Sequence, residues 1–129
     1  MTIARIALTV AALVLAGIGA GFLAMPVQWA SIVDISLPTA MARTDLRATY
    51  GGFDLGMGLF LALCALRTGW VRQGLAALGL GAGGYGGGRL LGILVEGTAS
   101  PLMVGFLVIE TVTAVAALEL LRRLSKVSS

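Results

Sequence analysis

The chain has 129 residues, of which 58% are hydrophobic and 12% are charged, with a formal net charge of +3. Soluble domains contain about 25% charged residues, so this composition excludes an ordinary soluble domain and predicts a single integral membrane domain. Histidine is absent and Cys64 is the only cysteine. These two facts exclude internal disulfides, the usual zinc and haem sites and histidine-dependent catalysis. We therefore expect no metal site, no cofactor and no catalytic residue.

Four apolar segments are long enough to cross a bilayer as helices, because about 20 residues rising about 1.5 Å each span about 30 Å of hydrocarbon. They cover residues 6–25, 48–66, 71–91 and 101–121, each boundary being approximate. Prolines interrupt the chain after the first segment, and charged or polar residues separate the other three. The sequence therefore predicts an all-α bundle of four transmembrane helices.

The first apolar segment, residues 6–25, also resembles a secretory signal, since Arg5 precedes it and small residues surround Gly19. Its apolar stretch is longer than a signal core and no polar domain follows, so we interpret it as a transmembrane helix. The connection that comes next, residues 26–45, contains Trp29 and several aliphatic residues. It is too apolar for a free loop and too short for another span, and we expect it to lie in the membrane interface or to cap the bundle.

The basic residues predict the orientation of these helices, because such residues are retained on the cytoplasmic side. With both termini in the cytoplasm, six basic residues fall on that side: Arg5, Arg67, Arg72, Arg122, Arg123 and Lys126. Three fall on the outer side: Arg43, Arg47 and Arg89. We therefore expect both termini to be cytoplasmic. The positive charge reflects this topology, and we do not expect nucleic acid as a partner.

Glycine is the most prominent residue inside the predicted helices. We expect helix packing at the glycines that recur with a four-residue spacing, namely Gly17, Gly21, Gly52, Gly56, Gly79, Gly83 and Gly87. In lipid, small residues at this spacing allow helix backbones to approach closely. Residues 79–88 contain seven glycines, so the third helix is either held by its neighbours or irregular, and both conditions suit a cavity wall. The run also matches G-x-G-x-x-G, but no strand precedes it, so packing is the better interpretation.

Ionisable residues inside the predicted spans carry the functional interest, since a charge at mid-bilayer costs about 2.5–3.5 kcal/mol. Spacings of three and four residues place Arg47, Tyr50 and Asp54 on one face of the second helix. Arg89 in the third helix reaches a similar outer level. Glu110 in the fourth helix is expected about 14 Å below the outer surface, near the bilayer midplane. We predict that these five residues form a polar cluster open toward the outer face.

Two interpretations of this cluster stay open. In the first, the charges form a structural ion-pair network that fixes the helix register. In the second, the arginines bind an anionic head group or a carboxylate beneath an outer vestibule, while the acids act as counter-charges or proton carriers. The hydroxyl groups of Tyr50 and Tyr85 add hydrogen-bonding partners in either case.

Several motifs resemble a bacterial family designated domain of unknown function 4345. They are the run T-D-L-R-A-T-Y-G-G at residues 44–52, the run R-L-L-G at residues 89–92, the pair Glu96-Gly97, and Glu110 in the last helix. The likeness covers most of the chain. The resemblance implies a small four-helix membrane protein, fits a bacterial inner membrane, and implies no particular activity. It gives weight, without roles, to Arg47, Tyr50, Gly51, Gly52, Arg89, Glu96, Gly97 and Glu110.

Three functions are compatible with these features. We favour a binding or accessory protein, which holds a lipid, a quinone or another apolar ligand, or packs onto a larger membrane complex. The alternative is a small homo-oligomeric transporter in which Asp54 or Glu110 carries a proton. A membrane enzyme is least favoured, because no nucleophile or metal set accompanies the two acids. The expected partners are membrane lipids and either a larger membrane complex or further copies of the chain.

Overall fold

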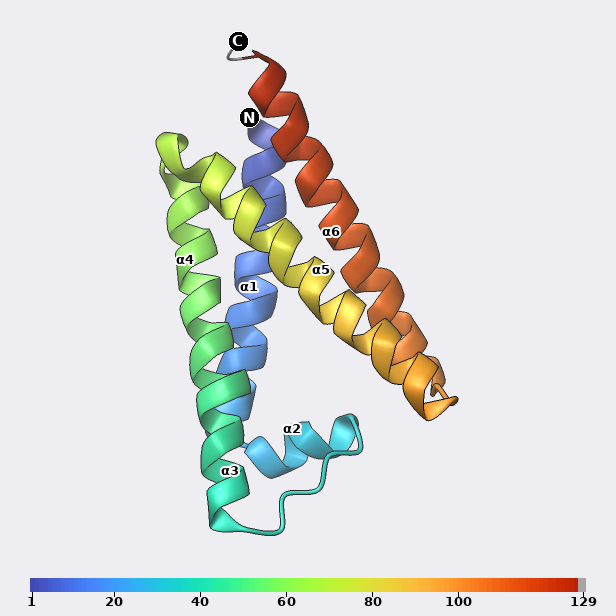
Figure 1. The fold of residues 1–129 in the computed structure, drawn as a ribbon. Helices are drawn as coiled ribbons and strands as arrows, with labels where there is room; N and C mark the ends of the chain where they lie inside the picture. The colour runs from blue at the N-terminus through green and yellow to red at the C-terminus, as the bar shows by residue number, and fades with distance from the viewer. Residues whose placement is uncertain (128–129) are drawn as a thin grey trace.

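The computed structural model describes residues 1–127, and within that range all regular elements are helices, with no strand (Figure 1). The elements are α1 (Thr2–Ala24), α2 (Pro26–Ile32), α3 (Ala40–Leu46), the π-helix η1 (Arg47–Phe53), α4 (Asp54–Leu66), the 3-10 turn η2 (Thr68–Trp70), α5 (Val71–Glu96) and α6 (Pro101–Val127). Because α3, η1 and α4 follow one another without a break, the described residues form five helices. The prediction of four helices was wrong in number, since the short helix α2 is the fifth.

Three of the helices are long and apolar enough to cross a membrane. They are α1, the continuous helix Ala40–Leu66, and α6 over Pro101–Lys126. The fourth long helix, α5, has 26 residues but contains many glycines and Arg89, which lower its hydropathy. The predicted all-α membrane-protein class therefore has support from three helices, and α5 is the helix whose composition sets it apart.

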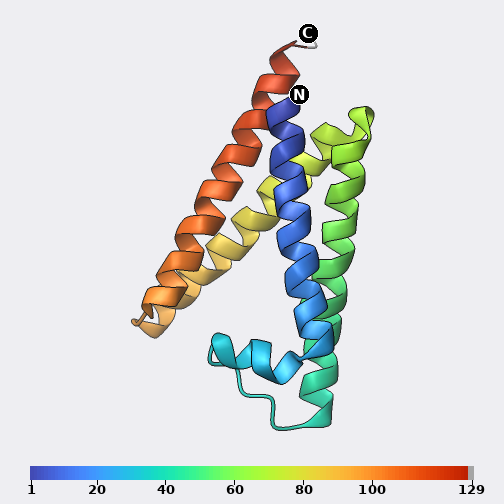
Figure 2. The same ribbon diagram turned by 180° about the vertical axis from the view of Figure 1, so that it is seen from behind.

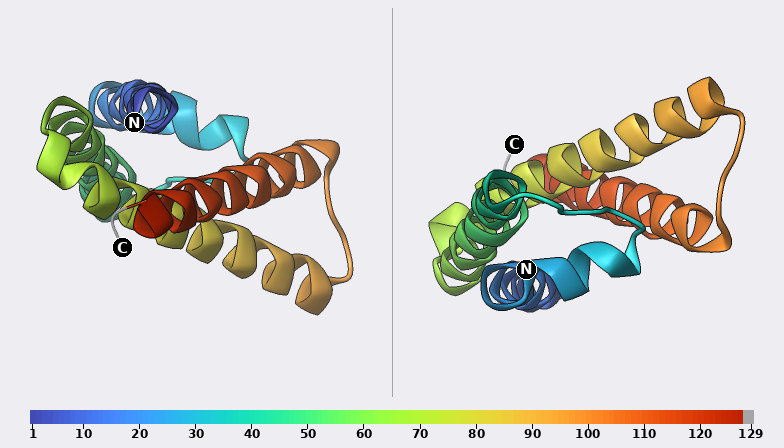
Figure 3. Two further views of the ribbon diagram at one scale, coloured as in Figure 1. Left: turned by 90° about the horizontal axis from the view of Figure 1, so that it is seen from above. Right: turned by 90° about the horizontal axis from the view of Figure 1, so that it is seen from below.

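The long helices are arranged as two antiparallel pairs. In one pair α1 lies against η1 and α4, and in the other α5 lies against α6 (Figures 1 and 2). The start of α1, the end of α6 and the turn between α4 and α5 lie at one end, which we call the terminal end. The two pairs are in contact at this end and diverge toward the other, where α2 and the α5–α6 turn lie (Figure 3). Residues 1–127 therefore form a wedge, and within that range the two helix pairs share a core only near the terminal end.

The main hydrophobic core lies in the half of the molecule nearer the terminal end. Its fully buried members include Leu8 of α1, Leu61 and Cys64 of α4, and Leu75 of α5. Gly74 lets α5 enter this core, because a Cβ atom there would lie only 2.6 Å from the Cβ atom of Cys64. Burial of these side chains and close backbone approach together hold the two helix pairs in contact at this end.

Two glycines bring the backbones of α1 and α4 into direct contact. A Cβ atom on Gly58 would lie 2.7 Å from the amide nitrogen of Ala16 and 2.9 Å from the carbonyl oxygen of Ala12. A Cβ atom on Gly19 would lie 2.7 Å from the carbonyl oxygen of Gly51. Any side chain at Gly19 or Gly58 would therefore push these helices apart.

The seven glycines predicted to pack fall into two groups. Three have side-chain atoms of another helix within 4 Å of where a Cβ atom would be: Gly21, Gly79 and Gly83. The other four have no atom of another helix in that range: Gly17, Gly52, Gly56 and Gly87. Two pairs of buried glycines are instead seven residues apart, namely Gly51 and Gly58 on the α1-facing side and Gly79 and Gly86 on the α6-facing side. A seven-residue repeat equals two helical turns and suits the shallow crossing of most membrane helices.

The connection between α1 and α4 folds back over the end of α1. Trp29 of α2 packs on Phe22 with their ring centroids 5.8 Å apart, and Phe22, Ala30 and Leu46 form a second small core. The hydroxyl group of Thr39 accepts a hydrogen bond from the amide of Ala42, which starts the helix at Ala40. The second long helix therefore begins eight residues before the predicted boundary, because a threonine cap and two further turns precede the apolar run.

Candidate functional site

The π-helix η1 determines which side chains face the gap between the helix pairs. Its backbone bonds join residues five apart, so its turn is wider than that of an α-helix, and such segments are frequent at functional sites. As a result Tyr50 and Phe53 are exposed, whereas Gly51 and Asp54 are buried. The single face expected for Arg47, Tyr50 and Asp54 is divided, because the expectation assumed α-helical spacing through this segment.

Arg47 is directed toward α1. Its Nε atom donates a hydrogen bond of 3.0 Å to the carbonyl oxygen of Leu23. This carbonyl belongs to the last turn of α1, where backbone oxygens lack partners within the helix and the helix dipole favours a cation. Arg47 therefore ties η1 to the end of α1, and it forms no ion pair with the acids of the predicted cluster.

Arg89 of α5 and Glu110 of α6 form a bidentate ion pair. The Nε atom of Arg89 donates to Oε2 at 2.9 Å, and its Nη2 atom donates to Oε1 at 2.7 Å. The two side chains are 26% and 16% exposed. Phe106 lies beneath the guanidinium group, with its ring centroid 5.1 Å from Cζ of Arg89. Gly86 faces Glu110, since a Cβ atom built on Gly86 would lie 3.5 Å from the Cβ atom of Glu110, an ordinary contact distance. The pair is neutral as a unit and joins α5 to α6.

Asp54 lies behind Tyr85, at the start of α4. Its side chain is 4% exposed, and the hydroxyl group of Tyr85 donates a long hydrogen bond of 3.4 Å to Oδ1. No cation pairs with this carboxyl group within the described residues. In the continuous helix Ala40–Leu66, Asp54 stands fourteen residues from one end and twelve from the other. This contact is the polar link between the two helix pairs at mid-helix.

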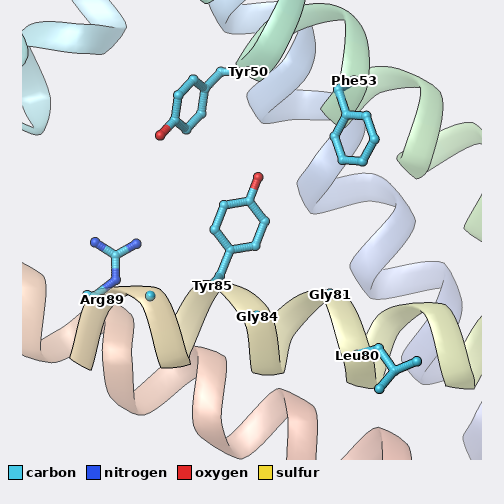
Figure 4. Close-up of a pocket in the computed structure, with 8 residues that line it drawn as sticks. Tyr50, Phe53, Leu80, Gly81, Gly84, Tyr85 and Arg89 are labelled. Carbon is cyan, nitrogen blue, oxygen red and sulfur yellow. The ribbon is translucent and has the colours of Figure 1, made fainter. Parts of the chain in front are cut away.

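A groove lies between η1 and α5 (Figure 4). It has a volume of about 520 Å³ and is lined by Tyr50, Phe53, Leu80, Gly81, Gly84, Tyr85, Gly88 and Arg89. A second hollow of about 530 Å³ shares three of these residues and extends over Ala48 and Thr49. A Cβ atom on Gly81, Gly84 or Gly88 would meet nothing within 4 Å. The glycines thus line the groove with bare backbone and do not serve to pack α5 against another helix.

The polar groups of the groove are few and are mainly hydrogen-bond donors. The hydroxyl groups of Tyr50 and Tyr85 point into the space from opposite walls, and Arg89 reaches into it from α5 (Figure 4). The ring of Tyr50 is held by Phe22, with centroids 5.2 Å apart. Aromatic walls with a small number of fixed polar groups are the usual makeup of a small-molecule site. Within residues 1–127, no three carboxylate or thiol side chains gather closely enough to hold a metal ion.

The structure thus brings together only part of the predicted cluster. Tyr50 and Arg89 line the same groove, Asp54 lies behind Tyr85, and Glu110 neutralises Arg89. Phe53 was not among the predicted site residues, and the glycines of the groove were foreseen only as part of the run 79–88 that suits a cavity wall. The signal for them was present in the sequence: Gly81, Gly84, Tyr85 and Gly88 follow spacings of three and four residues and so share one face of α5.

Comparison with known families agrees with the resemblance found in the motifs. A family model described as Domain of unknown function (DUF4345) matches residues 3–121, which is nearly the whole chain and includes both walls of the groove. Comparisons with curated proteins and with solved structures found no match. The chain therefore belongs to the family described as Domain of unknown function (DUF4345).

Proposed function

We propose that this protein binds an amphipathic molecule dissolved in the membrane, in the groove between η1 and α5. The observation that carries the proposal is the groove itself, whose volume of about 520 Å³ falls within the range of small-molecule sites, roughly 300–1,000 Å³. Its walls are aromatic and glycine-rich, and its polar groups come from Tyr50, Tyr85 and Arg89. This composition suits a largely apolar ligand with a small polar head.

Two glycines of α5, Gly84 and Gly88, support binding better than they support folding. Glycine costs about 1 kcal/mol of helix stability relative to alanine, so its use is favourable where a close contact repays that cost. Gly84 and Gly88 make no such contact within the described chain, since a Cβ atom on either would meet open space. We infer that these positions are kept bare for a molecule that lies directly against the backbone of α5.

We further propose that α5 crosses the membrane together with the three apolar helices, giving four crossings. It starts at the terminal end, where α4 stops, and finishes at the opposite end, where α6 starts (Figure 1). A chain whose neighbouring helices both cross must therefore cross here as well. The six basic residues near the terminal end favour its placement in the cytoplasm, and the inner membrane of a bacterium is the proposed location.

The proposal is tested by native mass spectrometry of the protein extracted gently from its membrane. A bound ligand is expected as a fixed added mass on the wild-type chain. The variant Gly84→Leu fills the groove and is expected to lose that mass. Gly56→Leu is the matched control, because Gly56 also has open space where a Cβ atom would be but does not line the groove. Both variants gain the same helix propensity, so folding effects cancel in the comparison.

The outcome is decisive in both directions. Loss of the added mass in Gly84→Leu, with retention in Gly56→Leu, would support binding in the groove. Retention of the same mass in both variants would refute it. A second polypeptide in place of a small molecule would instead favour the accessory role, with the outward-facing glycines Gly17, Gly56 and Gly87 as contact points for a larger complex or for further copies of the chain.

Proton-coupled transport is the second candidate, and Asp54 is the observation that favours it. A carboxyl group that is 4% exposed, near the middle of a spanning helix and without a cationic partner in the described chain, is typical of a proton carrier. The test is proton uptake into liposomes that contain the purified protein. Transport predicts uptake by the wild type and none by Asp54→Asn, whereas equal uptake by both would remove this candidate.

A further inference from the structure

The charge balance of the groove restricts the kind of head group that it can receive. Arg89 is the cation that lines the groove, and both Nε and Nη2 already donate to Glu110 at 2.9 and 2.7 Å. An anionic head group would have to compete with this bidentate carboxylate or would bring an extra negative charge beside it. A neutral head group meets neither cost. The ion pair therefore selects against phosphate and carboxylate ligands.

The hydrogen-bonding groups of the groove point to an acceptor on the ligand. Within residues 1–127, the hydroxyl group of Tyr50 and the Nη1 atom of Arg89 make no hydrogen bond to the protein. Both can donate, and both border the groove. Carbonyl oxygens are the neutral acceptors that such donors fit best in an apolar setting.

The walls of the groove favour a flat ring. Tyr50 and Phe53 project from η1 toward α5, while Tyr85 projects from α5 toward η1 (Figure 4). The bare backbone at Gly81 and Gly84 adds a surface without side chains, against which a planar group can lie. Aromatic rings stack on planar groups in offset or edge-to-face arrangements at centroid distances of roughly 4.5–7 Å. Leu80, which is 70% exposed, continues the groove with an apolar surface suited to a tail.

From these three features we infer that the ligand is a membrane quinone, a neutral planar ring with carbonyl oxygens on an apolar tail. This inference rests on the proposed binding function and names the class of ligand. Tyr50 and Arg89 donate hydrogen bonds to the ring carbonyls, and the aromatic side chains hold the two faces of the ring. Glu110 acts as a positioning residue, since it holds the guanidinium group of Arg89 at the edge of the groove.

The test measures equilibrium binding of two probes to the full chain in nanodiscs of neutral lipid. The first probe is a benzoquinone with one isoprenoid unit, and the second is the anionic lipid dioleoyl phosphatidylglycerol. Quinone affinity is expected to fall about five- to tenfold in Tyr50→Phe, which removes one hydrogen bond and keeps the ring. It is expected to be lost in Gly84→Leu and in Gly88→Leu, and to be unchanged in Gly56→Leu.

The outcomes separate this inference from the proposal beneath it. Quinone binding that weakens in Tyr50→Phe and disappears in the two groove-filling variants would support the inference. Binding of the anionic lipid in preference to quinone, with loss in Gly84→Leu, would overturn the quinone assignment while the groove remained a binding site. Binding of both probes that is equal in the wild type and in Gly84→Leu and Gly88→Leu would overturn the inference and the proposed function together.

Discussion

The ion pair between α5 and α6 offers a quantitative test of how these helices are held together. Removing one partner of a largely buried, bidentate pair leaves an uncompensated charge and costs about 3–5 kcal/mol. Arg89 and Glu110 are partly buried, at 26% and 16% exposed, and are joined by two hydrogen bonds, so the lower end of that range applies. We therefore expect Glu110→Ala to lower the free energy of unfolding by an amount in that range, because the guanidinium group of Arg89 loses its counter-ion.

A double variant distinguishes loss of the pair from loss of either side chain. Replacing both partners with apolar residues of similar size removes the unpaired charge, so Arg89→Leu with Glu110→Leu is expected to recover most of the stability lost in the single variants. The assay is reversible chemical unfolding in mixed micelles, followed by circular dichroism. The free energy of unfolding is measured for the wild type, the two single leucine variants and the double variant. These four values give the interaction energy between Arg89 and Glu110 directly.

The contrasting ion pair on the same helix is the control. Glu119 pairs with Arg122 and Arg123 near the end of α6, where the arginines are exposed. Glu119→Ala is expected to leave stability nearly unchanged, because exposed pairs contribute little. An interaction energy below about 0.5 kcal/mol for Arg89 and Glu110 would refute the argument that their pairing stabilises the contact between α5 and α6.

Three further predictions concern the pairing of α1 with the helix Ala40–Leu66. Gly58→Ala places a methyl group against the backbone of α1 and is expected to lower the free energy of unfolding by about 1–3 kcal/mol in the same assay. Gly56→Ala is the control and is expected to lower it by nothing, because its methyl group meets open space. Equal effects of the two variants would contradict the packing described. Arg47→Met removes the hydrogen bond to the carbonyl oxygen of Leu23, so hydrogen exchange of the backbone amides in the last turn of α1 is expected to accelerate. An unchanged exchange rate would mean that this hydrogen bond does not protect the end of α1. Thr39→Ala removes a helix cap and is expected to cost about 1 kcal/mol, a loss that Thr39→Ser largely avoids.

Local signals in the sequence were sufficient for much of the fold. Composition and apolar length predicted a helical membrane protein. The starts of α5 and α6 were also marked in the sequence, since a polar turn precedes Val71 and Pro101 is itself the first residue of α6. The hydroxyl group of Ser100 caps α6 as a serine before a proline suggests. The wedge shape was not predictable in this way, since it depends on which glycines pack: Gly74 brings α5 into the core at the terminal end, whereas the glycines farther along α5, such as Gly84 and Gly88, contact no other helix in the described chain.

The candidate site was less accessible to sequence reasoning for a specific geometric reason. The predicted cluster assumed an ordinary α-helix through Arg47, Tyr50 and Asp54, whereas the π-helix η1 rotates these side chains in different directions. Arg47 reaches back to α1 and Asp54 turns inward, so only Tyr50 of the three faces the groove. The position of Arg89 and Glu110 was easier to foresee, because both lie in regular helices that are adjacent in the chain.

The most direct test of ligand binding in the wedge is photo-crosslinking in the native membrane, with a benzophenone amino acid placed at Phe53. Leu59 is the control position, since it lies on the same helix and is equally exposed, at 58% against 59%, but does not line the groove. Binding in the groove predicts that the label at Phe53 captures a single small molecule of defined mass, and that the label at Leu59 captures only bulk lipid. Capture of a second polypeptide at Phe53, or the same lipids at both positions, would contradict it.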